Sequence, residues 1–179
     1  EIEWKKYVAC LFKFSKVLSN YCSIKILNNE DDSTMSAIDK NDLTMLQKSK
    51  KDLSATDLSG ANLEGIDLSF GNLISTNFKE ACLKNANFAS AKLDSADFTK
   101  TDLSGADFSH AKLFKAILFQ AKLSESKFIE ADLMGANLSS SDLTGADLSR
   151  CSLVEANLIG SNLTGANLKC INHPICESG

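Results

Sequence analysis

The chain has 179 residues, 44% of them apolar, and a formal net charge of −4 at pH 7. This length suits one domain with an appendage, and the mildly acidic balance excludes both a strongly basic nucleic-acid binder and a highly charged tail. Because the first residue is Glu1 rather than Met, we expect a trimmed or processed chain from which a targeting signal can have been removed.

Residues 1–28 carry apolar side chains at three- and four-residue spacing, which is typical of an amphipathic helix. These apolar positions are Trp4, Tyr7, Val8, Leu11, Phe14, Leu18 and Tyr21 or Cys22. Lysines interrupt the stretch too often for a transmembrane span. Two interpretations stay open. We favour a helix that caps the open end of the repeat region, where backbone groups would otherwise be unpaired; the alternative is contact with a membrane or a partner.

Residues 29–50 are mostly polar and form either a linker or a degenerate first coil of the repeat region. Ile38 and Leu43 fall in the five-residue register of the sequence that follows, but Lys48 would then occupy a core position. A charge at that position argues against a complete coil, and short helical turns around Met35 and Met45 are an equal alternative.

Residues 51–170 repeat every five residues. Leu or Phe stands at each fifth position from Leu53 to Leu168, which makes 24 consecutive units. The residue two positions earlier is almost always small, and the residue between them is Asp or Asn in seventeen of the 24 units. A period of five fits neither a helix nor a strand, so each unit must turn a corner. Units this short bury apolar side chains only by stacking, which predicts an all-β solenoid.

The repeat resembles the pentapeptide-repeat family through units such as Ala61-Asn62-Leu63-Glu64-Gly65 and Ala106-Asp107-Phe108-Ser109-His110. The resemblance implies a right-handed, quadrilateral parallel β-helix with one unit on each side and about twenty residues in each coil. Laid out in twenties, residues 51–170 fill six coils and place the phenylalanines on two opposite sides. We therefore predict these core residues: Leu53, Phe78, Phe88, Phe98, Phe108, Phe128, Leu148 and Leu168.

Residues 171–179 form a short tail. Pro174 has no backbone N–H to donate to a further rung, so the β-ladder should end before it. The spacing of Cys170, His173 and Cys176 suits a metal site with one ligand missing, or a disulfide between the two cysteines. We predict no metal, no cofactor and no catalytic residues, because the many Asp and Asn side chains are better explained as turn-forming groups. A cytoplasmic location is favoured, with a secreted or lumenal one as the alternative if Cys170 and Cys176 are oxidised.

Six apolar residues occupy outward positions that are normally polar in this repeat. They are Phe114, Ile117, Phe119, Met134, Val154 and Ile159. Apolar patches on soluble proteins usually mark contact with a partner, so we predict a protein-binding or homodimer surface, rimmed by Lys112, Lys115 and Glu155. The alternative is that the N-terminal helix covers this surface.

The sequence thus predicts a non-enzymatic protein-protein interaction module of unknown partner. One alternative is the substrate-recruiting domain of a larger effector or ubiquitin-ligase-type enzyme. Another, less favoured, is the DNA mimicry by which one branch of the family protects topoisomerases, because Lys122 and Lys127 interrupt the acidic columns here. Lysines are scattered over several sides, so we expect no nucleic-acid contact.

Overall fold

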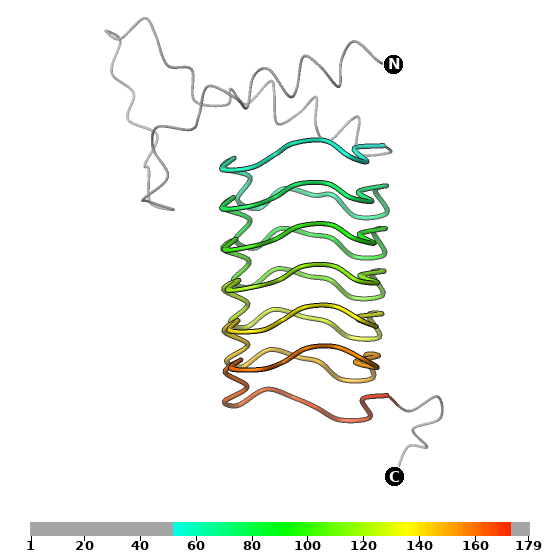
Figure 1. Ribbon diagram of the computed structural model, residues 1–179, viewed down its shortest axis with the longest axis vertical. Helices are drawn as coiled ribbons and strands as arrows, with labels where there is room; N and C mark the ends of the chain where they lie inside the picture. The colour runs from blue at the N-terminus through cyan, green and yellow to red at the C-terminus, as the bar shows by residue number, and fades with distance from the viewer. Residues whose placement is uncertain (1–51, 173–179) are drawn as a thin grey trace, which may run out of the picture.

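The computed structural model describes residues 52–172, and Figure 1 shows them as flat coils stacked along the long axis of the molecule. The helix expected over residues 1–28, the linker at 29–50 and the tail from residue 173 lie outside the described residues. The described range contains turns and isolated parallel β-bridges, with no helix and no continuous strand. Within it, therefore, no helix is long and apolar enough to cross a membrane.

Each five-residue unit ends in a tight turn. The amide of Ala106 donates to the carbonyl of Leu103 across 3.0 Å, and Gly105, the residue before that amide, has a φ of +70°. A hydrogen bond from the fourth to the first residue, with a positive φ at the third, is the pattern of a type II turn. The same bond recurs in every unit from Leu53 to Leu163. The chain therefore changes direction every five residues, as the sequence period requires.

The coils contain twenty residues. Parallel bridges join residues twenty apart along the whole described range, from Asp57 with Asn77 to Asp147 with Asn167. Two backbone hydrogen bonds support each rung, as where the amide of Leu58 donates to the carbonyl of Asn77 across 2.8 Å. The predicted twenty-residue coil is confirmed, whereas the total of six coils and the N-terminal helix stay predictions.

Leucine and phenylalanine side chains point inward and form one continuous core. Phe78, Phe88, Phe98, Phe108 and Phe128 have no exposed surface, and neither do Leu53 and Leu148. Phe88 stacks face to face on Phe108 with ring centroids 4.9 Å apart, and Phe78 meets Phe88 edge to face at 5.8 Å. The two phenylalanine columns therefore touch across the core, in the geometries that aromatic rings prefer.

Leu168 corrects the predicted core. Its side chain is 40% exposed, whereas that of Leu148, one coil earlier, is fully buried. The last described bridge joins Asp147 to Asn167, so no described coil covers the far side of Leu168. Register alone predicts burial only for a coil with neighbours on both sides.

Asn172 ends the described ladder. In the coils before it, each inward Leu donates its amide to a backbone carbonyl nineteen residues later, as Leu133 does to Ser152. The amide of Leu153 donates instead to the side-chain Oδ1 of Asn172, whose own amide donates to the carbonyl of Cys151. A side chain thus supplies the acceptor that a further coil supplies elsewhere.

Candidate protein-binding surface

Aspartate and asparagine side chains hold the turns. The amide of Ser109 donates to Oδ1 of Asp107 across 2.8 Å. Nearly every other Asp or Asn that stands immediately before an inward Leu or Phe accepts the same bond from the amide two residues later. Some also link coils, as where Nδ2 of Asn77 donates to Oδ1 of Asp57 across 2.9 Å. Because either residue type supplies the acceptor oxygen, the carboxylates have a structural role here.

Asp97 illustrates how these carboxylates are held. Burial alone would raise its pKa. Bonds from the hydroxyl and amide of Thr99, together with the Lys79 ammonium 3.0 Å away, outweigh burial and hold the pKa of Asp97 below its usual value. Over the described range, no three His, Cys, Asp or Glu side chains form a group that could hold a metal ion.

Three cysteines, Cys82, Cys151 and Cys170, lie in the described region. Cys151 is a buried free thiol whose pKa burial raises to about 12. Cys82 and Cys170 each belong to a disulfide, and they lie in coils too far apart to be bonded to each other. The proposed partners of Cys170 in a metal site or disulfide, His173 and Cys176, lie outside the described residues.

His110 lies at an outward corner beside charged residues of the following coils. Nδ1 of His110 lies 3.3 Å from Glu130, one coil on. Glu130 in turn lies 3.1 Å from Nε of Arg150 in the following coil. The side chains of His110 and Arg150 are more than half exposed and that of Glu130 is 39% exposed, so these surface ion pairs contribute little to stability.

Residues 111–130 depart from the turn pattern on all four sides. Their four Asp/Asn sites hold Lys112, Ile117, Lys122 and Lys127. As a result, no side chain in the described range accepts from the turn amides of Phe114, Phe119, Ser124 and Ile129. Elsewhere such replacements are single, as at Cys82 and Ser152. Four together in one coil set this coil apart from its neighbours.

The apolar outward residues lie on this coil and the two coils after it. We call the six predicted residues the apolar surface: Phe114, Ile117, Phe119, Met134, Val154 and Ile159. Phe114, Met134 and Val154 form one column because they are twenty residues apart, and the bridges of Asp132 with Lys112 and with Ser152 confirm that their units stack.

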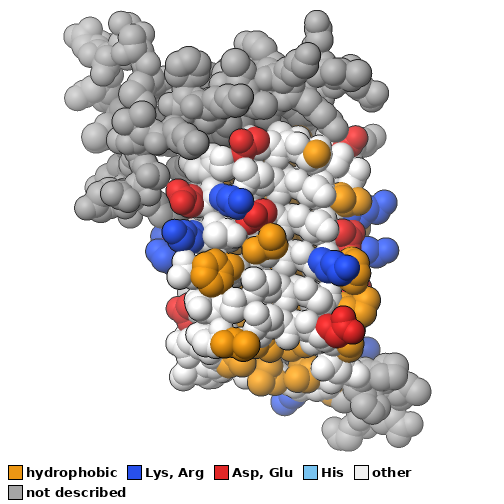
Figure 2. Space-filling view, in the orientation of Figure 1, with side chains coloured by type: hydrophobic (Ala, Val, Ile, Leu, Met, Phe, Trp, Pro, Cys, Tyr) orange, Lys and Arg blue, Asp and Glu red, His pale blue; other side chains and the backbone are white. Residues whose placement is uncertain are grey.

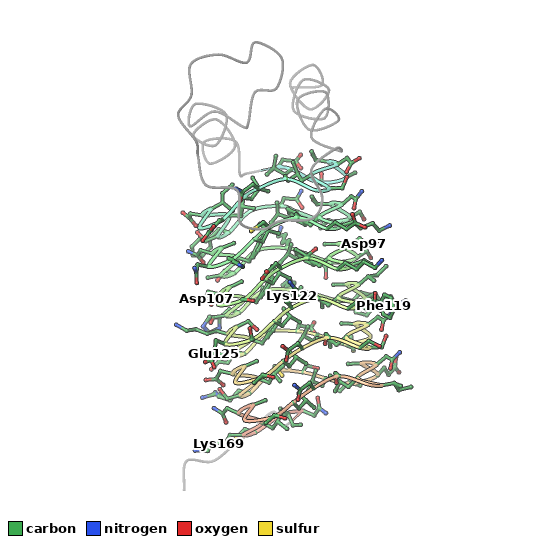
Figure 3. The ribbon with its side chains drawn as sticks, turned by 90° about the vertical axis from the view of Figure 1, so that its left-hand side faces the viewer. Asp97, Asp107, Phe119, Lys122, Glu125 and Lys169 are labelled. Carbon is green, nitrogen blue, oxygen red and sulfur yellow. The ribbon has the colours of Figure 1, made fainter. Side chains whose placement is uncertain are left out.

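These side chains are accessible to different degrees. Ile117 is 37%, Met134 36%, Val154 45% and Ile159 79% exposed, whereas Phe114 and Phe119 are half-buried. Figure 2 shows hydrophobic side chains in the middle of one face and along its right-hand edge. In Figure 3, Phe119 lies at one edge and Lys122 near the middle, so they belong to different sides.

Charged residues flank the corner between the two apolar columns. Nζ of Lys115 lies 5.0 Å from the centre of the Phe114 ring, which is within the range of a cation–π contact. A Cβ built on Gly135 would lie 3.3 Å from Cγ of Lys115. The lysine stem therefore extends over the glycine of the next coil and covers part of the apolar surface.

The sequence prediction left out three outward apolar side chains, two of them exposed and one half-buried. Phe70 is 77% exposed at a corner position with a φ of +59°, and Ile74 is 36% exposed in the column of Phe114. Ile129 is half-buried in the same coil as Phe114. Comparing all four sides of residues 111–130 would have found Ile129, because three of the four sites that follow the inward Leu or Phe are apolar there.

Comparison with known proteins bears on the whole repeat region. The family model described as pentapeptide repeats (8 copies) matches residues 52–88, 81–118, 116–153 and 131–169. No curated protein sequence matches the chain.

Several solved structures are similar to the chain. One is HetL, a pentapeptide repeat protein involved in heterocyst differentiation regulation from the cyanobacterium Nostoc sp. strain PCC 7120, at 22% identity over 72% of this chain and 92% of that one, with a TM-score of 0.44. Another is a pentapeptide repeat protein from the Arabidopsis thaliana thylakoid lumen, at 31% identity over 63% and 72%, also with a TM-score of 0.44. A third is QnrB1, a plasmid-mediated fluoroquinolone resistance protein, at 23% identity over 65% and 76%, with a TM-score of 0.37.

Proposed function

The chain belongs to the pentapeptide-repeat family, and from this premise we propose that it is a non-enzymatic protein-protein interaction module whose contact site is the apolar surface. The observation that carries the proposal is that apolar side chains replace polar ones in three successive coils on one side, and in the first and third of these coils on the adjoining side. A fold alone does not set a function, so the partner must be inferred from this site.

The exposed area supports a contact role. Met134, Val154 and Ile159 are at least a third exposed. On the opposite side of the rod, the sites equivalent to Phe114 and Met134 hold short polar residues, Ser124 and Thr144. Contiguous apolar surface of this kind is uncommon on a protein that contacts nothing. Burying it against a partner would remove apolar area from water, which is favourable by about 25 cal/mol for each Å².

The backbone beneath the surface supports specificity. Each rung is fixed by parallel bridges and by turn bonds, so the apolar side chains stand on a framework that does not have to be ordered on binding. A preorganised site loses less conformational entropy than a flexible one.

The charge distribution does not favour DNA mimicry. Lys122 lies between Asp102 and Asp142 in one column, with its Nζ 3.7 Å from Asp102. Asp102 also lies 3.6 Å from Nζ of Lys84. The acidic column is therefore neutralised in part instead of presenting a continuous negative surface.

The decisive variant is Phe114→Glu combined with Met134→Glu. Self-association of the full chain is measured by sedimentation, and peptide binding by selection from a random-peptide phage library. We expect the double variant to lose whichever association the unmodified chain shows and to keep its melting temperature. The matched control is Ser124→Glu with Thr144→Glu, at the same sites of the same coils ten residues further on. If the first variant kept its binding, or the control variant lost it, the interaction surface would have been assigned to the wrong side of the rod.

A further inference from the structure

Two lysines are stacked directly on one another beside the apolar surface. Lys92 and Lys112 form a parallel bridge in adjacent coils, at sites where Asp or Asn is usual. Both side chains are exposed, and neither makes an ion pair with any residue between 52 and 172. Like charges opposite one another on neighbouring strands are unfavourable. An anion placed between them would therefore relieve repulsion as well as gain attraction.

The same two units leave turn amides without a side-chain acceptor. In the following coil, Oδ1 of Asp132 accepts from the amide of Met134 across 3.1 Å. Lysine offers no acceptor, so the equivalent amides of Asp94 and Phe114 have none within the described part of the chain. Because these amides donate to outward side chains elsewhere, they point toward the surface where Lys92 and Lys112 lie.

Three lysines face two acidic residues at this site. Asp94 follows Lys92 by two residues and Asp132 forms a bridge with Lys112 from the next coil, but neither carboxylate makes an ion pair with a described lysine. Lys115 adds a third ammonium group 5.0 Å from the ring of Phe114. The site therefore combines three lysines and two donors at one end of the column with Phe114, Met134 and Val154 at the other.

We propose that the partner carries an acidic segment, in which an Asp or Glu carboxylate binds between Lys92 and Lys112 and neighbouring apolar side chains cover Phe114 and Met134. This inference rests on the proposed function and names the chemistry of its partner. A carboxylate has two oxygens, and coils stacked about 4.8 Å apart let it accept from the amides of Asp94 and Phe114 together. Hydrogen bonds to a charged acceptor are roughly twice as strong as those between neutral groups.

The test uses the full chain and peptides selected from a random-peptide phage library. We expect selected peptides to combine Asp or Glu with apolar residues. A synthetic copy in which each acidic residue becomes Asn or Gln should bind about tenfold more weakly, and added salt should weaken the original peptide but not the copy. In nitrogen-15 NMR spectra at saturation, the acidic peptide should shift the amide signals of Asp94 and Phe114 further than the copy does.

Matched lysine variants locate the site. Lys112→Gln should weaken binding of the acidic peptide about tenfold, to the level of the amide copy. Lys122→Gln is the control, because Lys122 occupies the same site of the same coil on the opposite side and should leave binding unchanged. Circular dichroism of both variants verifies that they fold.

The outcomes separate the two proposals. Selection of peptides without acidic residues would overturn the acidic partner but not the interaction surface. The same conclusion would follow if Lys112→Gln left peptide binding unchanged while the variant with Phe114→Glu and Met134→Glu bound more weakly. Equal peptide affinity for that double variant and for the unmodified chain would overturn both proposals. A dimer of the unmodified chain that Lys112→Gln dissociates would assign the carboxylate to a second copy and overturn a separate partner. Failure to enrich any peptide would overturn the acidic segment.

Discussion

Glu125 lies directly over Gly145, the corner residue of the next coil. A Cβ built on Gly145 would lie 2.8 Å from Cδ of Glu125 and closer still to its Oε1. Asn85 and Gly105 are related in the same way, with a Cβ at Gly105 placed 2.5 Å from Oδ1 of Asn85. By contrast, nothing lies within 4 Å of a Cβ built on Gly65. Corner side chains thus extend along the rod into space that a glycine leaves open.

This relationship predicts a difference between two glycine substitutions. Gly65 and Gly145 both have a φ of +68°, so alanine at either position should cost about 1 kcal/mol through its left-handed conformation. Gly145→Ala must also move the carboxylate of Glu125, which is the flexible end of an exposed side chain, so denaturant titration should show it to be less stable than Gly65→Ala by a small margin. The difference should disappear when Glu125→Ala is present in both proteins. An equal loss at the two glycines in the original background would contradict the contact.

The phenylalanine columns predict a large core effect. Phe108 is fully buried and stacks on Phe88 at 4.9 Å and on Phe128 at 4.8 Å. Phe108→Ala should therefore lower the free energy of unfolding by about 3 to 5 kcal/mol, because it opens a cavity between two rings. The outward substitution Ser109→Ala should be nearly neutral in the same titration. Similar losses for both variants would mean that the inward and outward sides are wrongly assigned.

The sequence period predicted the turns and the stacking, and the family resemblance implied the twenty-residue coil. A period of five requires a turn in every unit, and the segregation of phenylalanines in a layout of twenty gives the two columns that meet at Phe78 and Phe88. It also placed Met134 and Val154 on the surface, because an apolar residue stands out at a site that is otherwise polar.

End effects and contacts between coils could not be predicted in this way. The exposure of Leu168 depends on whether a coil follows it, which a regular repeat does not show. The corner contact of Glu125 with Gly145 depends on the rotamer of a long side chain. The donors left open at Asp94 and Phe114 become visible only when the hydrogen bonds of neighbouring turns are compared.

Cys151 predicts a pH dependence of stability. Burial disfavours the thiolate and raises the pKa from 9.0 to about 12, so the folded chain holds this proton more tightly than the unfolded chain. The stabilisation is complete below pH 9 and is lost as the pH rises from 9 toward 12. Cys151→Ala should lack this loss of stability at high pH. Alanine fits the position, because Ala131 occupies the equivalent site one coil earlier.

The measurement for Cys151 is denaturant titration of both proteins across that pH range. The stability of the unmodified chain should fall relative to Cys151→Ala above pH 9. As a control, alkylation at pH 8 should leave Cys151 unmodified in the native chain and modify it in denaturant. Parallel stability curves for the two proteins would show that the thiol is not buried.

Asn172 predicts how the described ladder is capped. Its Oδ1 accepts from the amide of Leu153, and its φ of +57° is one that Asn tolerates better than most residues. Asn172→Ala should lower stability by about 1 kcal/mol through the lost acceptor, with a further loss from the backbone conformation. Asn172→Gly removes only the acceptor, because glycine adopts this conformation freely, and Asn172→Asp keeps an acceptor oxygen. Amide hydrogen exchange of Leu153 should therefore be fast in the Ala and Gly variants and slow in the Asp variant and the unmodified chain. Slow exchange in the Gly variant would mean that another group accepts from Leu153 and that Asn172 is not the cap.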